Sequence, residues 1–327
     1  MKRAAAVVLV AVAASGCFVS LGGPLSMLGG DRPLDEKTLE GEGRAKILLV
    51  DLSGVITDQP ERHAFGLVEE ESTLARVKST LEKAKDDSRV KALLLRINSP
   101  GGGVTASDEI YNEILRFKRE ENVPVVASLG DVAASGGYYV ACAADTIVAH
   151  PTTVTGSIGV IMMNLNLEGL LGKIGVKNQT FKAGEHKDIL SPLRPVTPEE
   201  RRIVQGILDS MHKRFIGVVT DSRAAKLEQT RLAELTDGRI FDANQALEAG
   251  LVDEVGTLAQ AIETTKKKAG LKEARVVTYE RHGEMHENIY SRTRGMPAQI
   301  NVLPVDIGAL TGSGARFMYL WSPGVVE

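Results

Sequence analysis

The stretch Asp131–Cys142, which reads DVAASGGYYVAC, decides the fold that we expect for this chain. Before it, residues 124–130 form a short apolar run that a proline opens and a glycine closes, as in a buried strand. Near its end, residues 138–144 contain no helix breaker and suit a small, mostly buried helix. The sequence therefore predicts a sharp corner between a strand and a helix, with Ser135 at the corner.

Ser135 is the candidate nucleophile that this corner presents. The corner lifts the hydroxyl out of the packed layers, and Gly136 and Gly137 directly behind it let a substrate backbone come close. The new helix also points free N–H groups and the positive end of its dipole at the same spot, which favours a developing oxyanion. The alternative is that Ser135 only caps its helix through its side chain, and the local sequence does not decide between the two.

A second glycine-rich turn, Gly101–Gly103, follows another strand-like stretch of the chain. Strands and helices alternate here, which predicts βαβ units and a largely parallel sheet with helices packed against it. The expected strands are 45–52, 90–97, 123–129 and 146–149, and the expected helices are 73–85, 107–119 and 135–144. Turns that follow consecutive parallel strands lie at the same sheet edge, so we expect the functional site between the two glycine turns.

The second half of the chain predicts fewer regular elements. Residues 179–184 suit a strand and a turn, Thr197 opens the longest helix, which runs to about Ser222, and residues 275–279 suit a final strand. From residue 280 onward the chain is irregular and rich in glycine, proline and polar residues. We expect its apolar end, at residues 316–321, to pack on the body, on a neighbouring subunit or in the chain's own site.

The charge balance and the histidines exclude several function classes. The 327 residues include 39 basic and 42 acidic ones, and the net charge of -3 suggests no nucleic-acid partner. None of the six histidines pairs with cysteine, aspartate or glutamate at metal-ligand spacing, so we expect no metal and no other cofactor. The turn Gly101–Gly103 lacks the Lys-Ser/Thr ending of a phosphate-binding loop.

The first residues predict export and an anchor. Lys2 and Arg3 precede an apolar run over residues 4–14, which is too short to span a bilayer but matches the core of a secretory signal. The run leads into Ala-Ser-Gly-Cys, which resembles a bacterial lipobox and makes Cys17 the expected lipidated first residue of the mature protein. The alternatives are an ordinary signal peptide and an uncleaved anchor.

These patterns divide the chain into four parts. We expect a signal peptide at 1–17, a flexible tether at 18–44, a main domain at 45–279 and an irregular tail at 280–327. The second cysteine, Cys142, lies in the apolar stretch after the corner and is expected to be a small buried side chain. With one thiol acylated and one buried, we expect no disulfide.

Five motifs in order carry a family resemblance. They are Asn-Ser-Pro-Gly-Gly at 98–102, Ala-Ser-Gly-Gly-Tyr-Tyr at 134–139, Thr-Gly-Ser-Ile-Gly-Val at 155–160, Lys-Asp at 187–188 with Ser-Pro at 191–192, and Gly-Arg-Ile-Phe at 238–241 with Gly-Leu-Val-Asp at 250–253. With these motifs the chain resembles bacterial signal peptide peptidase A in its short, single-copy form, from about residue 45 to residue 279. The resemblance implies an α/β fold of the Clp-protease or crotonase-like type, a spiral of βαβ units.

The resemblance also assigns a base to the nucleophile. It implies a Ser/Lys dyad in which the amine of Lys187 activates Ser135, because a serine hydroxyl alone is a poor nucleophile. A lysine amine is a base only when it is uncharged, so we expect Lys187 in an apolar pocket, with Asp188 facing elsewhere. Lys182 is its nearest rival. Ser157 matches the serine that orients the lysine.

The same resemblance implies which groups bind the oxyanion. The N–H groups of Gly136 and Gly102 match the two donors, although Gly101 and Gly103 flank the second and the sequence cannot separate the three. His186 lies beside the expected base, but alternation in an extended segment places it on the opposite face. No histidine need take part.

The resemblance implies a membrane-attached serine endopeptidase that degrades cleaved signal peptides and similar apolar peptides. It also implies a ring-shaped homo-oligomer whose neighbouring subunits complete each site, with the protease domain in the cell envelope, outside the cytoplasm. The family usually attaches through an N-terminal transmembrane helix, so a lipobox is a departure. Two alternatives stay open: a crotonase-like protein that binds acyl-CoA at the same oxyanion hole, and an inactive lipoprotein scaffold.

Overall fold

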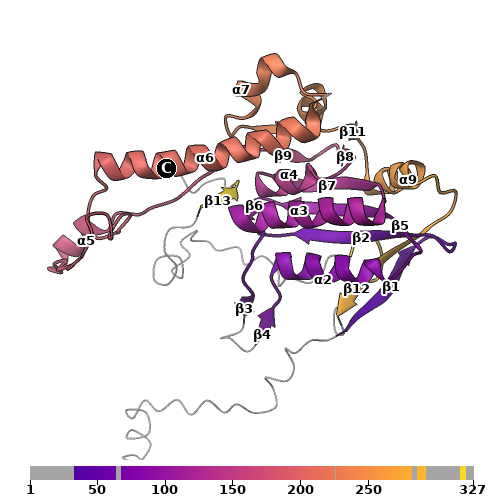
Figure 1. Cartoon of the computed structure of the whole chain (residues 1–327), viewed down its shortest axis with the longest axis horizontal. Coiled ribbons are helices and arrows are strands. Elements are labelled where there is room, and N and C mark those ends of the chain that lie inside the picture. The colour runs from indigo at the N-terminus through magenta and orange to yellow at the C-terminus, as the bar shows by residue number, and fades with distance from the viewer. Residues whose placement is uncertain (1–32, 64–67, 225, 282–285, 292–316, 322–327) are drawn as a thin grey trace, which may run out of the picture.

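A large, mostly parallel sheet forms the centre of the protein (Figure 1). The computed structural model describes residues 33–63, 68–224, 226–281, 286–291 and 317–321. Neighbouring strands follow in the order β1 (Leu34–Glu40), β12 (Arg275–Arg281), β2 (Lys46–Ser53), β5 (Val90–Ser99), β7 (Val125–Ala134), β8 (Thr146–Ala149) and β11 (Glu254–Val255). From β12 to β11 each pair is parallel, whereas β1 is antiparallel to β12.

Two short strands extend the sheet at the end of β7. β9 (Val154–Gly156) is parallel to the last three residues of β7, and β10 (Ile240–Asp242) is antiparallel to β9. The first half of β7 pairs instead with β8. β7 therefore extends beyond the end of β8, pairs there with β9, and ends directly before Ser135.

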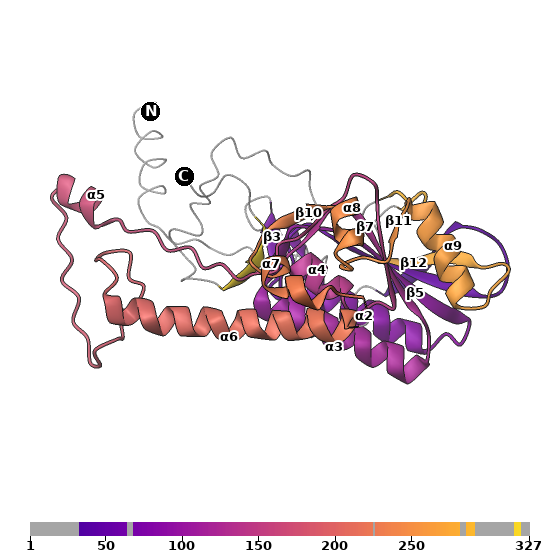
Figure 2. The same cartoon turned by 90° about the horizontal axis from the view of Figure 1, so that it is seen from above.

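Helices cover both faces of the sheet (Figures 1 and 2). α2 (Thr73–Lys85), α3 (Val104–Glu121) and α4 (Gly136–Ala141) lie on one face, and α9 (Leu258–Lys268) lies on the other. Along β5, Leu93 and Leu95 join the core on the first face, whereas Ala92 and Leu94 join the core under α9. A strand buried on both faces reads as a continuous apolar run, as the sequence predicted.

The predicted fold class is confirmed, since parallel strands alternate with crossover helices from β2 to β8. The helices expected at 73–85 and 107–119 are α2 and the greater part of α3. Cys142 is free and buried, as expected, and burial raises the pKa of its thiol to about 11. The other short elements are β3 (Glu61–His63), β4 (Val68–Glu70), η3 (Gln229–Arg231), α7 (Leu232–Leu235) and α8 (Ala243–Glu248).

The tether predicted at 18–44 is wrong for residues 34–40, which form β1 at the edge of the sheet. Charged side chains occupy most positions of β1, so its sequence shows little of the apolar alternation that predicts a strand. Leu34 packs against the core, and the buried amine of Lys46 bonds Glu36. A charged edge strand of this kind resists pairing with other chains. The lipobox and the rest of residues 1–32 lie outside the described residues.

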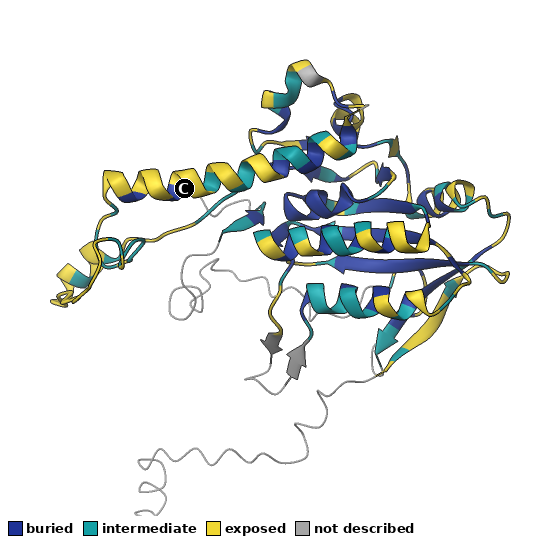
Figure 3. Ribbon diagram, viewed as in Figure 1, coloured by how far each residue is buried: buried dark blue, intermediate teal, exposed yellow. Residues whose placement is uncertain are grey.

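Between β9 and β10 the chain leaves the body as an arm, which consists of residues 162–197 and the first half of α6 (Figure 2). α6 (Pro198–Arg223) begins with a capping box of Thr197 and Glu200, and beyond that first turn most of its buried residues lie in its second half. α5 (Glu168–Lys173), at the far end, has no buried residue (Figure 3). The strand predicted at 179–184 is wrong, because this segment lies in the arm as exposed coil with no strand beside it.

Within the described ranges, none of the helices has both the length and the apolar character that a bilayer crossing needs.

A buried ion pair fixes the inner end of α6 to the sheet. Two nitrogens of Arg223 each donate to one carboxylate oxygen of Asp253 at 2.9 Å, and Arg223 Nε donates to the carbonyl of Gly250 at 2.9 Å. The same carboxylate accepts from the N–H of Ile147 in β8 at 2.8 Å. Burial would raise the pKa of Asp253, but the hydrogen bonds from Arg223 and Lys226 outweigh it and hold this pKa below its usual range.

We predict that Asp253→Asn lowers the free energy of unfolding at pH 7 by about 3 kcal/mol, because it leaves the buried guanidinium without its counter-charge. A depressed carboxyl pKa stabilises the fold above the unfolded-state pKa, and that contribution is lost as pH falls through the folded-state pKa. The difference in free energy of unfolding between the variant and the wild type, measured by urea titration, should therefore become smaller below about pH 4. Glu248→Gln, at an exposed acid nearby, is the matched control and should change stability by less than about 0.5 kcal/mol.

Candidate active site

Ser135 occupies the predicted corner between β7 and α4. Its φ is 51° and its ψ is -117°, a region that side-chain-bearing residues rarely adopt. Two backbone bonds hold it there: its N–H donates to the carbonyl of Gly156 in β9, and its carbonyl accepts from the N–H of Tyr139, both at 2.8 Å. Thr155, also in β9, donates its hydroxyl to the carbonyl of Ala133 at 2.6 Å. β9 thus holds the strained corner from outside.

The hydroxyl of Ser135 is buried and uncommitted. Its side chain makes no capping bond to α4, so the alternative that Ser135 only caps the helix is wrong. The residue is 1% exposed, and its Oγ has no hydrogen-bond partner among the described residues. Buried hydroxyls in proteins are nearly always bonded. An unbonded one at a strained corner is typical of a group that acts on a bound molecule.

The two glycine turns are in contact, as the sheet order predicted. A Cβ atom on Gly101 would lie 2.7 Å from the nitrogen of Gly136, and one on Gly136 would lie 3.1 Å from the Cα of Gly101. Gly101 also has a φ of +102°. Only residues without a side chain allow the two turns to approach this closely. The N–H of Gly136, at the first position of α4, has no helical acceptor and is available to a ligand at this junction.

The turn at 101–103 is itself a short strand, β6 (Gly101–Gly103), with a neighbour on each side. On one side, Ile56 accepts from the N–H of Gly103 and donates to the carbonyl of Gly101, both at 2.9 Å. On the other side, β13 (Met318–Leu320) pairs antiparallel with β6. Of the three places expected for the end of the tail, the described residues therefore occupy the chain's own site.

Lys187 does not lie at Ser135 within one chain. It is exposed in the arm, and its side chain has no hydrogen bond or ion pair to any described residue. The expectation of an apolar pocket for Lys187 is therefore wrong for the single chain, because the arm leaves the body and brings no buried side chains around it. Ser157 stands beside the corner, with a φ of 50° and 8% exposure, and its N–H donates to the carbonyl of Arg239 at 2.7 Å. It makes no bond to Lys187.

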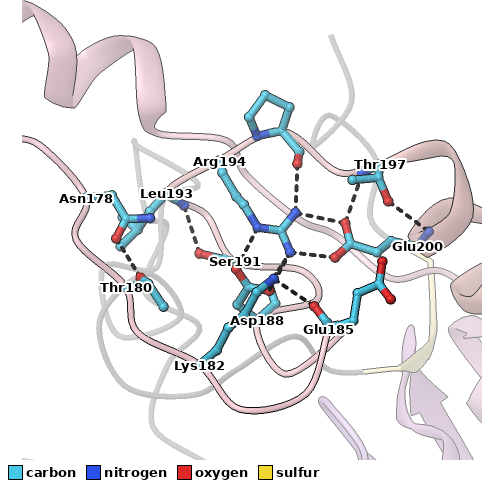
Figure 4. A network of polar contacts seen from close by, with 11 residues as sticks. Asn178, Thr180, Lys182, Glu185, Asp188, Ser191, Leu193, Arg194, Thr197 and Glu200 are labelled. Atoms are coloured by element: carbon cyan, nitrogen blue, oxygen red, sulfur yellow. Dashed lines mark hydrogen bonds and ion pairs between the residues drawn. The ribbon is translucent and has the colours of Figure 1, made fainter.

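The rival lysine and the neighbouring aspartate belong to a surface network (Figure 4). Lys182 donates to the carbonyl of Glu185 and to the carboxylate of Asp188, both at 2.7 Å. Asp188 also accepts from Arg194 at 2.7 Å, and these bonds from Arg194 and Lys182 lower the pKa of the carboxyl. The prediction that Asp188 faces away from Lys187 is confirmed.

Arg194 ties this network to the start of α6. It donates to Glu200 at 2.9 Å. The pKa of Glu200 is lowered to about 2, mainly by the hydrogen bonds from Arg194 and next by the one from the N–H of Thr197. The network therefore gives the loop at 182–194 a defined shape although it lies in the arm.

One surface cluster has atoms that a metal ion could bind. One ligand atom each from Glu185, His186 and Glu199 lies within 4.8 Å of the others, and none of the three is buried. His186 Nε2 is 3.9 Å from Glu199, so this histidine faces an acid of α6 rather than Ser135. Exposed acidic groups often gather in this way without an ion.

Sequence reasoning missed one edge of the groove that β13 occupies between β6 and Ile161, and it missed the residue behind the other edge. Ile161 donates to and accepts from Met318, both at 3.0 Å, and Ile56 supports β6 from behind. Both isoleucines act through backbone groups, which leave no motif in a sequence.

Comparisons with known proteins identify the family. The profile of Peptidase family S49 matches residues 117–272, and that of Clp protease matches residues 62–155. The chain is 39% identical over 251 residues to a candidate signal peptide peptidase SppA of Enterococcus faecium, and the aligned stretch covers 76% of this chain and 72% of that protein. It is 37% identical over 192 residues to the chloroplastic serine protease SPPA of Arabidopsis thaliana, and the aligned stretch covers 58% of this chain and 28% of that protein.

Among solved structures, a ClpP1 variant from Listeria monocytogenes is similar with 17% identity and a TM-score of 0.42, over 65% of this chain and 94% of that one. A serine at a strand-to-helix corner, beside a glycine turn at the edge of a parallel sheet, defines a serine peptidase together with the S49 profile and the two sequence relatives. The chain belongs to peptidase family S49.

The strain at Ser135 gives a prediction about stability. Ser135→Gly should have a free energy of unfolding about 1 kcal/mol higher than that of Ser135→Ala, because glycine adopts this backbone conformation without strain. Denaturant titrations of the two variants measure the difference. In the interior of the preceding strand β7, at Ser128, the order should reverse, with the glycine variant less stable than the alanine variant by about 1 kcal/mol. Equal stabilities for the two variants at position 135 would contradict the strained corner.

Proposed function

We propose that this protein is a serine endopeptidase that degrades cleaved signal peptides and similar apolar peptides, with Ser135 as its nucleophile. The observation that carries the proposal is the uncommitted hydroxyl of Ser135 at a strained corner, beside the backbone edge of β6. An extended peptide that added to β6 would bring its carbonyl groups past this hydroxyl. Attack by Oγ would form a tetrahedral intermediate, whose oxyanion the N–H groups of Gly136 and Gly102 would bind.

Lys187 is the proposed general base, supplied by a neighbouring subunit. It is exposed in the arm that projects from the body (Figure 2), and its side chain has no hydrogen bond or ion pair to a described residue. The arm and the first half of α6 also carry large apolar side chains in the open: Leu165, Leu170, Ile174, Val176, Phe181, Ile203 and Ile207. A ring of subunits would cover such a surface and exclude water from the amine, which favours its uncharged form. Ser157, beside the corner, would orient the incoming amine.

The groove suits apolar peptides of varied sequence. Its two edges, β6 and Ile161, bind through backbone groups, which every peptide can match. The segments around the corner are rich in alanine and glycine, whose small size suits shallow apolar subsites.

We predict that Ser135→Ala and Lys187→Ala each lower the hydrolysis of an apolar peptide by at least about 1,000-fold, because each removes half of the dyad. Lys177→Ala, at another exposed lysine of the arm, is the matched control and should keep wild-type turnover. Initial rates on a fluorogenic peptide, with circular dichroism to verify folding, make the measurement.

Mixing the two inactive variants tests where the lysine comes from. If each site takes Ser135 from one subunit and Lys187 from the next, co-assembled rings should regain about a quarter of the wild-type activity. Activity in each folded variant alone, near the wild-type level, would refute the dyad, and binding of acyl-CoA by such variants would favour a crotonase-like role. Full loss in both variants without rescue on mixing would place the lysine in the same subunit as the serine.

We further propose that Cys17 carries a lipid anchor that holds the peptidase domain at a membrane of the cell envelope, outside the cytoplasm. The lipobox-like Ala-Ser-Gly-Cys supports this proposal. Cys17→Ser should move the protein from the membrane fraction to the soluble fraction of a fractionated cell. Unchanged partition of the variant would mean that another segment forms the anchor.

A further inference from the structure

A bulge in β7 lies directly before the strand-to-helix corner of the candidate site. The regular parallel pairing of β5 with β7 continues to Ile97 and Leu129. The next pair along the two strands is Ser99 with Ala133. Between these pairs β5 has one residue, whereas β7 has three, residues 130–132. β7 therefore contains two extra residues, and the part of the chain that follows them is shifted by two positions relative to β5.

The bulge decides which part of the glycine turn the nucleophile meets. Two residues after the pair of Ser99 and Ala133, the chain of β5 reaches Gly101 and the chain of β7 reaches Ser135. Each strand residue advances a chain by about 3.3 Å, so an unbulged β7 would carry the serine about 7 Å past this level. In the structure, a Cβ on Gly101 would lie 2.7 Å from the nitrogen of Gly136. The bulge therefore sets the corner against the glycine turn.

The side chain of Asn98 closes the bulge from β5. Its Oδ1 accepts from the N–H of Val132 at 3.0 Å, and its Nδ2 donates to the carboxylate of Asp131 at 3.4 Å. A Cβ on Gly130 would lie 3.2 Å from the Cβ of Asn98, so a residue without a side chain gives the amide its room. Because a bulge interrupts the backbone ladder, the amide oxygen replaces the acceptor that a β5 carbonyl supplies in a regular pair.

Thr153 holds the bulge from the opposite side. It is fully buried in the segment before β9, and its hydroxyl donates to the carbonyl of Gly130 at 2.6 Å and lies 3.2 Å from that of Leu129. The N–H of Thr153 donates to the carbonyl of His150 at 2.8 Å, which fixes the threonine in turn. A buried carbonyl without a donor is costly, so the hydroxyl favours the bulged form of β7 over other forms.

We propose that Asn98 and Thr153 are positioning residues of the peptidase, which hold the bulge of β7 and thereby place the hydroxyl of Ser135 at the reacting carbonyl. The inference rests on the peptidase function proposed above. Asn98 opens the motif Asn-Ser-Pro-Gly-Gly, in which that function uses only the glycines. Both side chains bond residues of β7 and not the serine, so they act through the backbone of the strand.

The position of the bulge predicts which kinetic constant depends on it. A peptide that adds to the edge of β6 binds through a segment that neither Asn98 nor Thr153 bonds. The nucleophile, in contrast, directly follows the bulged strand. A misplacement of a reacting group by about 1 Å can cost about 100-fold in rate. Loss of either side chain should therefore lower kcat and leave KM nearly unchanged.

Variants of the full chain test this split on the hydrolysis of an apolar peptide. Asn98→Ala and Thr153→Val should each lower kcat by at least about tenfold and keep KM within about twofold of wild type. Thr153→Ser, which keeps the hydroxyl, should restore kcat to within about threefold of wild type. Asn244→Ala, in exposed α8, and Thr152→Val, at the exposed neighbour of Thr153, are the matched controls and should keep wild-type constants.

Hydrogen exchange read by mass spectrometry tests the bulge without turnover. In the Ser135→Ala background, adding Asn98→Ala should speed exchange over residues 130–134 by at least about tenfold and leave β2 unchanged, because the N–H of Val132 loses its acceptor. Unchanged exchange at the bulge would contradict the hold of Asn98 on β7.

The two measurements separate the failure of this inference from that of the peptidase function. Faster exchange at the bulge without hydrolysis by any protein, wild type included, would overturn the peptidase function and keep the hold of Asn98 on β7. Hydrolysis by wild type, with kcat unchanged in Asn98→Ala and Thr153→Val or with a loss that lies entirely in KM, would overturn the positioning role and keep the peptidase. Should Asn98→Ala fail to fold, the comparison of Thr153→Val with Thr153→Ser decides.

Discussion

The structure depends on the close approach of two backbone turns at one edge of a parallel sheet. Gly101 and Gly136 approach so closely that a methyl group on either would meet the backbone of the other turn. This contact brings β6, the N–H groups at the start of α4 and the hydroxyl of Ser135 to one place. Parallel order in β5 and β7 makes the meeting possible, because both strands end at the same edge.

The corner at Ser135 is stable only because its neighbours hold it. β9 bonds both the end of β7 and the N–H of Ser135, and α4 is anchored below by the hydroxyl of Tyr138, which donates to the carbonyl of Leu251 at 2.7 Å. Leu251 belongs to the segment that ends at Asp253, the acid that fixes α6. The motif Gly-Leu-Val-Asp, far from the serine in sequence, thus supports the corner from the core.

The sequence was sufficient for the sheet, the corner and the glycine turns, since these depend on local apolar runs and on residues without side chains. It was insufficient for β1, whose charged residues give no apolar alternation, and for the groove edge at Ile161, which acts through its backbone. The surroundings of Lys187 could not be predicted from the sequence either. Whether water is excluded from its amine depends on what packs against the arm, and the alternation of neighbouring residues does not show this.

The place of Tyr319 has a consequence for how the protein is made. The ribosome adds residues 317–321 after every other described part of the chain, including Tyr139 and Phe215. A nascent chain can therefore form its parallel sheet and helices before the ring of Tyr319 packs against Tyr139 and Phe215. The order of synthesis makes β13 the last described strand to join the fold, by pairing with β6 and Ile161.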